Sequence, residues 1–122
     1  MPLTNEGRDI ISAALAGESY TPLDNTATLA VGDSSATFDK SQIDLQGTKY
    51  APVLDGSYPQ RESSHEVAYR ITAGKEQANF HWREIGLFNS GNSMVVRDVQ
   101  DLGLKPATQI WELTVILDVQ NP

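Results

Sequence analysis

The 122-residue chain carries 16 acidic and nine basic side chains, a formal net charge of −7, and no cysteine. Without cysteine it has no disulfide framework, no thiolate zinc site and no cysteine nucleophile. The negative charge repels phosphate backbones, and the five arginines and four lysines are scattered singly, so we expect no direct contact with nucleic acid.

Signals for membrane insertion or export are missing from the sequence. No stretch approaches the roughly 20 apolar residues that cross a bilayer, and the start, MPLTNEGRD, lacks the basic end and apolar run of a secretory signal. We therefore expect a soluble, unprocessed protein with no membrane partner. A chain of this length is expected to fold as a single domain, residues 1–122.

Residues 1–18 have the pattern of one short amphipathic helix. Thr4 or Asn5 is a suitable N-cap, apolar residues follow at helical spacing, and Gly17 is a typical stop. Two interpretations are open: the helix covers an open end of the core, or it protrudes as an arm that docks onto a partner. In the second interpretation Ile10 and Ile11 are candidate interface residues.

The polar segments predict neither a metal site nor a bound cofactor. The segment GDSSATFD, residues 32–39, lacks the spaced acidic residues and closing Glu of a calcium loop. It is expected to form a capped turn ahead of a short helical piece near DKSQIDLQG. His65 and His81 are the only imidazoles and have no clustered carboxylates around them in the sequence. The chain contains no phosphate loop, nucleophile elbow or cofactor motif.

The segment from Gly47 to Ser64, GTKYAPVLDGSYPQRESS, reads as neither strand nor helix and is long for a connection in a small domain. Tyr50, Tyr58 and Arg61 are residue types that often anchor interfaces. The segment is therefore interpreted as a contact surface or, alternatively, as a loop packed on its own sheet.

The stretch from Asn79 to Asn89, NFHWREIGLFN, predicts a wall of the core. Its apolar residues divide between two parities, and a β-bulge in the middle would bring them to one face. Phe80, Trp82 and Leu87 are then core residues, and we expect Trp82 to meet Trp111.

The same stretch could instead be read as a catalytic site, with His81, Arg83 and Glu84 as acid, clamp and base. Acid–base catalysis needs two groups that converge on one substrate atom, whereas neighbours in a strand point to opposite faces. We therefore predict no catalytic residues and a protein that is not an enzyme. His81 and either Arg83 or Glu84 are expected to face solvent or a cross-strand partner, and a buried ion pair between Glu84 and an arginine is the alternative.

Segments with an apolar period of two extend from residue 26 to residue 120, which indicates strands. The clearest is the last, TQIWELTVILDVQ, where Trp111, Leu113 and Val115 share one apolar face as further core residues. SMVVRDV precedes it and is joined to the core-wall stretch by NSGN, a typical hairpin turn. The predicted fold is therefore mainly β, an antiparallel β-sandwich or jelly-roll-like domain with a short N-terminal helix.

Several blocks in this order resemble a family of small virion structural proteins of tailed bacteriophages, often labelled tail fibre proteins. The blocks are LAVGDSSATFDKSQIDLQG, YPQR, EQANFHWREIGLFNS, VRDVQDLG and TQIWELTVILDV, which together span most of residues 29–119. The sequence departs from the family pattern at Ile85, where Trp is frequent, and at KPATQIW, where small hydroxyl residues are usual.

The resemblance implies a non-enzymatic structural protein of the virion, located on the exterior of the head or on the tail. Because the chain continues into no fibre shaft, we expect a capsid decoration or cement protein that binds the major capsid protein. The alternative is a tail, collar, baseplate or tail-fibre-associated protein with tail or collar partners, and an enzyme or host-directed effector is a third class. Both structural roles predict a homo-oligomer, a dimer or trimer, because virion positions repeat around symmetry axes.

Overall fold

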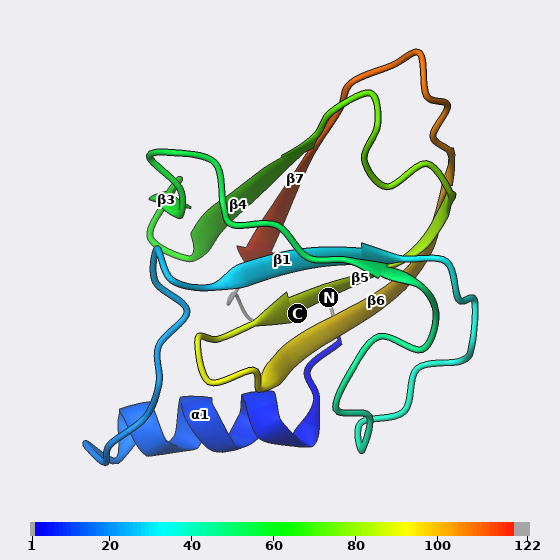
Figure 1. The fold of residues 1–122 in the computed structure, drawn as a ribbon. Helices are drawn as coiled ribbons and strands as arrows, with labels where there is room; N and C mark the ends of the chain where they lie inside the picture. Colours follow the sequence, from blue (N-terminus) through cyan, green and yellow to red (C-terminus); the bar gives the residue numbers. More distant parts are fainter. Residues whose placement is uncertain (1, 119–122) are drawn as a thin grey trace.

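The computed structural model describes residues 2–118, which form one helix and seven strands in two antiparallel sheets (Figure 1). The mainly β fold predicted from the sequence is confirmed. The elements in chain order are α1 (Asn5–Leu15), β1 (Thr28–Gly32), β2 (Lys49–Tyr50), β3 (Gln60–Arg61), β4 (Glu66–Ala73), β5 (His81–Phe88), β6 (Met94–Leu104) and β7 (Trp111–Asp118). The predicted last strand continues to residue 120, and residues 119 and 120 lie outside the described part of the chain.

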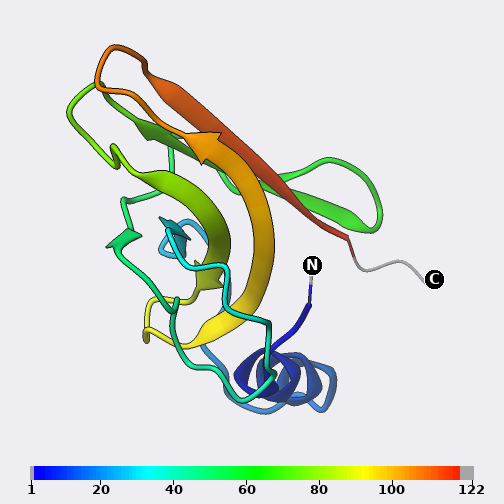
Figure 2. The ribbon, with the colours of Figure 1, turned by 90° about the vertical axis from the view of Figure 1, so that its right-hand side faces the viewer.

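The strand order is β2-β1-β5-β6 in the four-stranded sheet and β3-β4-β7 in the three-stranded sheet. Figure 2 shows β5 and β6 as strongly curved ribbons that face the straighter pair β4 and β7. The β4–β7 pair is regular from Glu66 opposite Asp118 to Ala73 opposite Trp111. Strands β6 and β7 are each the last strand of their sheet; the segment before α1 bridges the start of β6 at Val96, and no strand within residues 2–118 pairs with the rest of that edge or with the outer edge of β7.

Apolar side chains from both sheets fill the space between them. Trp82, Leu87 and Val115 are buried there, as predicted, while Phe80, Leu113 and Trp111 are partly buried and pack against the same cluster. The rings of Trp82 and Trp111 meet edge to face, with centroids 5.1 Å apart and planes at 76°. The expected meeting of the two tryptophans is thereby confirmed, in a geometry that aromatic pairs favour.

The predicted β-bulge in β5 is confirmed. The register with β6 shifts between Trp82 and Glu84, so that Trp82, Ile85 and Leu87 join the same cluster despite their different parity. The opposite face of the four-stranded sheet is also covered. Its apolar residues, with one from the loop of residues 33–48, form a second buried cluster of Ala30, Leu45, Phe88 and Met94. The 33–48 loop therefore acts as a third layer.

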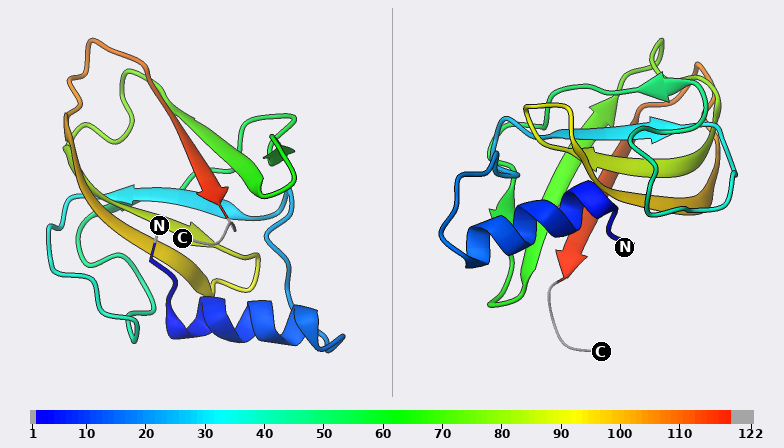
Figure 3. Two further views of the ribbon diagram at one scale, coloured as in Figure 1. Left: turned by 180° about the vertical axis from the view of Figure 1, so that it is seen from behind. Right: turned by 90° about the horizontal axis from the view of Figure 1, so that it is seen from below.

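Helix α1 is anchored at its N-terminal end. Thr4, not Asn5, is the N-cap: its hydroxyl accepts from the Gly7 amide and donates to the Met94 carbonyl. Gly7 approaches β6 so closely that a Cβ would overlap the Val95 carbonyl oxygen. The helix thus lies alongside the four-stranded sheet (Figure 3) and ends before Gly17, whose φ of 73° suits glycine.

Two local expectations are wrong. The short helical piece near DKSQIDLQG does not form: residues 33–48 contain turns and bends, because amides that a helix would use donate instead to the Glu84 carboxylate. The segment from Gly47 to Ser64 is not wholly irregular, since β2 pairs with β1 and β3 pairs with β4. Within residues 2–118 the structure has no helix long and apolar enough to cross a membrane.

Candidate functional site

The charged side chains of the core-wall stretch each have a hydrogen-bond partner of their own. Nε2 of the His81 imidazole on β5 lies 2.5 Å from a carboxylate oxygen of Asp101 on the neighbouring strand β6. The pKa of Asp101 is lowered mainly by its hydrogen bond with His81 and, to a smaller extent, by the hydrogen bond that the Gly103 amide donates to it. Arg83 donates to the Asp33 carbonyl over 3.4 Å. Of the two expectations for Glu84, the buried ion pair with an arginine is confirmed.

The Glu84 carboxylate is fully buried and accepts four hydrogen bonds. Three come from backbone amides of the 33–48 loop: those of Ser34 and Gly47 to Oε2 at 3.1 and 2.9 Å, and that of Gln46 to Oε1 at 2.8 Å. The fourth comes from Nε of Arg97 at 3.0 Å. A buried charge is tolerated when it is paired and hydrogen-bonded in this way.

Arg97 extends the network to the middle of the loop. Its Nη1 donates to the Ala36 carbonyl at 3.0 Å and to the side-chain oxygen of Gln42 at 3.1 Å. Its side chain, like that of Glu84, has 0% exposure. The guanidinium therefore holds the middle of the loop, and the carboxylate holds its two ends.

This arrangement is structural rather than reactive. A proton-transfer group needs an open approach for substrate and a free lone pair, whereas both carboxylate oxygens of Glu84 are occupied and closed off from solvent. Gly32 of β1 leaves room for this carboxylate, because a Cβ there would overlap the Glu84 side chain. The ion pair Glu84–Arg97 therefore holds the 33–48 loop against the four-stranded sheet.

A group of possible metal ligands appears that the sequence did not indicate. His65, Glu66 and Asp118 place one ligand-type atom each within 4.8 Å of one another, because Asp118 of β7 lies opposite Glu66 of β4. His65 Nδ1 is already 2.9 Å from Asp118 Oδ1, and Glu66 Oε1 accepts from the Ser63 hydroxyl at 2.9 Å. We interpret the group as a link between the two strands.

The candidate interface residues have different surroundings. The Tyr50 hydroxyl donates to the Thr72 carbonyl at 3.3 Å, and burial raises its pKa. The Tyr58 ring lies under the Arg70 guanidinium at 4.7 Å. Both tyrosines therefore pack on their own domain, which was the alternative interpretation of this segment. Arg61 is exposed.

The two candidates on α1 also differ from each other. Ile10 packs partly against the core, whereas Ile11 is 38% exposed. Leu15, which was not singled out from the sequence, is 85% exposed at the unanchored end of the helix. The residues proposed for an interface thus do not share one surface environment.

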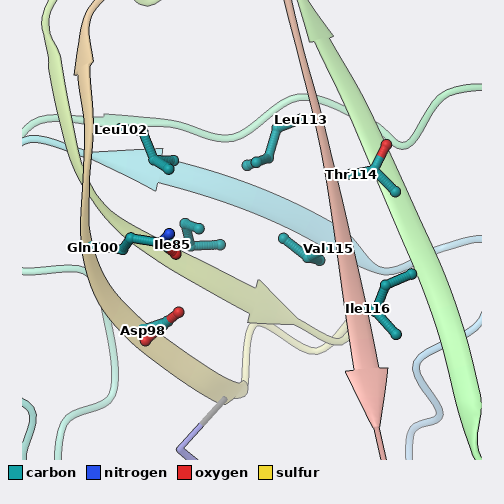
Figure 4. A pocket seen from close by; sticks show the side chains of 8 residues that line it. All are labelled: Ile85, Asp98, Gln100, Leu102, Leu113, Thr114, Val115 and Ile116. Atoms are coloured by element: carbon teal, nitrogen blue, oxygen red, sulfur yellow. The ribbon is translucent and has the colours of Figure 1, made fainter.

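A groove between the free edges of β6 and β7 was not predicted. It has a volume of about 290 Å³ and opens to solvent between the two sheets (Figure 4). Its side chains come from β5, β6 and β7, and they are Ile85, Asp98, Gln100, Leu102, Leu113, Thr114, Val115 and Ile116. The signal in the sequence was the alternation of Asp98, Gln100 and Leu102 in one strand, which puts polar residues on an inward face.

Comparisons of the chain with models of protein families, with curated proteins and with solved structures found no match. The functional assignment therefore depends on the residues themselves and on the sequence resemblance.

Proposed function

We propose that the chain is a non-enzymatic virion structural protein of a tailed bacteriophage, and that it binds the outside of the assembled capsid as a decoration or cement protein. The observation that supports the proposal is the meeting of three sequence blocks at one buried ion pair. The 33–48 loop, the REIGLFN strand and the VRDV strand are joined through Glu84 and Arg97.

These three blocks also carry the resemblance to phage virion proteins. Their polar residues have structural tasks: Glu84 binds loop amides, Arg97 binds loop oxygens, and Asp33 accepts from the Thr48 amide at 2.7 Å. Shared blocks of this kind specify an architecture, because each polar group is needed to close the loop over the sheet. The resemblance is therefore read as a likeness of fold and role rather than of a reaction.

A decoration protein has to be rigid and must add binding energy only when its target surface is assembled. The three-layer domain supplies the rigidity, with sheet faces buried on both sides of β5. A protein that binds only the assembled shell stabilises it by linkage, in proportion to the logarithm of its concentration over Kd. The net charge of −7 suits an exterior position, where no packaged DNA has to be held.

The proposed partners are the major capsid protein and further copies of the chain, as a symmetric dimer or trimer. The test is the copy number per purified virion, measured by mass spectrometry with isotope-labelled peptides of this chain, the major capsid protein and the tail tube protein. Copies comparable in number to the capsid protein support decoration. A few copies per virion, in proportion to a tail component, would assign the chain to the tail or collar. Absence from virions would refute both structural roles.

A further inference from the structure

We propose that the groove between β6 and β7 binds an extended, basic segment of a partner protein, which adds to a free strand edge and places a lysine or arginine beside Asp98. This inference depends on the groove alone and is independent of the virion assignment.

Both walls of the groove are free strand edges. The segment before α1 covers only the start of β6: the Arg97 amide donates to the Pro2 carbonyl, Leu3 bridges Val96, and the Thr4 amide donates to the Val95 carbonyl. From Asp98 to Leu104, and along the outer side of β7, no strand within residues 2–118 pairs with these edges. Unpaired backbone groups in such a row are a template for an additional strand.

The floor of the groove is apolar. Ile85, Leu102, Leu113 and Val115 line it, and Ile116 is 40% exposed at the rim. Its volume of about 290 Å³ lies at the lower limit of ligand pockets. The unpaired backbone edges favour an extended segment, because it can pair with them and direct alternate apolar side chains into this space, whereas a helix has no backbone groups left to pair.

Asp98 determines the charge of the occupant. Its half-buried carboxylate points from β6 into the groove (Figure 4), and no residue in the described part of the chain offers it a hydrogen bond or counter-charge. The carboxylates nearby are already paired, Asp101 with His81 and Glu112 with Arg70. The charged form of a carboxylate beside apolar side chains is stabilised most by lysine or arginine, because the methylene groups of these side chains can pack on the apolar floor while the charged group reaches the carboxylate.

A second copy of the chain fits the groove less well. Antiparallel pairing of two β7 strands centred on Val115 would place Glu112 opposite Asp118 of the other copy, and like charges opposite each other destabilise a sheet. An inward-pointing charge on an edge strand also discourages unspecific pairing. The acidic residues of β7 thus disfavour a second copy, and Asp98 disfavours an acidic strand while it attracts a basic one.

The test uses two synthetic peptides, TKTVTVTKT and TETVTVTET, with blocked ends, in which the charged residues lie on the same face as the valines. They share β-propensity and apolar spacing, and the charged residues near both ends present the same charge to Asp98 in either orientation. Each peptide is titrated into ¹⁵N-labelled protein, and the amide resonances of residues 98–104 and 111–118 are followed by NMR. The Asp98→Asn variant is compared with Asp9→Asn, which changes the net charge equally on the exposed face of α1.

We expect the lysine peptide to shift the groove resonances and to bind about fivefold more tightly than the glutamate peptide, equivalent to about 1 kcal/mol. Asp98→Asn should abolish this preference, while Asp9→Asn should retain it. Absence of groove shifts with both peptides, or an equal preference in Asp98→Asn and wild type, would overturn the proposal. Concentration-dependent shifts of the same resonances without peptide would show instead that a second copy occupies the groove.

Discussion

Removal of the Glu84 carboxylate tests the central energetic inference. In Glu84→Leu the fully buried Arg97 loses its counter-charge, and removal of one partner from a buried ion pair costs about 3–5 kcal/mol. Three loop amides also lose their acceptor. Since a domain of this kind is stabilised by only about 5–15 kcal/mol, the variant should lose a large fraction of its stability.

The companion variants separate charge from hydrogen bonding. Arg97→Leu should cost less than Glu84→Leu, because three backbone amides still solvate the carboxylate. The double variant with leucine at both positions removes both charges and should be more stable than Glu84→Leu alone. It should still fall below wild type, because an unsatisfied buried amide costs about 1–3 kcal/mol unless the loop opens to water.

Urea unfolding followed by tryptophan fluorescence measures these differences. With a slope of about 2 kcal/mol per M, the Glu84→Leu midpoint should fall by roughly 2 M. The control is Asp44→Asn, which removes an exposed pair with Lys49 in the same loop region and should cost less than about 1 kcal/mol. The reasoning is refuted if Glu84→Leu unfolds at the wild-type midpoint or costs no more than Asp44→Asn.

Three further predictions concern the helix, a buried tyrosine and the tryptophan pair. Gly7→Ala should lower Tm despite the higher helix propensity of alanine, since its Cβ would overlap a β6 carbonyl, whereas Gly56→Ala has open space and should be near neutral; equal Tm values would contradict this. Burial raises the Tyr69 pKa from 10.0 to about 12, so the neutral form adds stability below pH 10 that is lost as the pH rises towards 12. The urea midpoint should fall over that window, and less so in Tyr69→Phe. Trp82→Ala should cost about 3–5 kcal/mol in urea unfolding, and Trp111→Ala less, because Trp82 is buried whereas Trp111 is only partly buried. A double-mutant cycle should give a coupling of about 0.5–1.5 kcal/mol, and a coupling of zero would mean that the ring contact contributes nothing.

Features set by local pattern could be predicted from the sequence. The Thr4 or Asn5 cap, the alternation in β4 and β7, and the turn between β5 and β6 all follow from neighbours a few residues apart. The bulge in β5 could also be inferred, because only a parity change brings Trp82 and Leu87 to one face.

Features that depend on distant residues could not be predicted. Residues 33–48 are rich in Ser, Asp and Gln and have the pattern of a solvated loop, yet their amides are satisfied by a carboxylate from β5. Burial of β5 on both faces removes the alternation that would mark one side as exposed. The groove depends on which strands lie last in each sheet, and the missing partner of Asp98 becomes visible only when its spatial neighbours are known.

The ion pair beneath the loop also sets the alignment of the strands. Glu84 lies opposite Gly32 of β1, and Arg97 of β6 lies opposite Gly86 of β5. A slip of β5 by one residue would turn the carboxylate towards the apolar layer, where an unpaired charge costs far more than a lost apolar contact. A chain with leucine at both positions could accept the shifted pairing. The buried charge of Glu84 thus disfavours misaligned pairings of β5 relative to the native one.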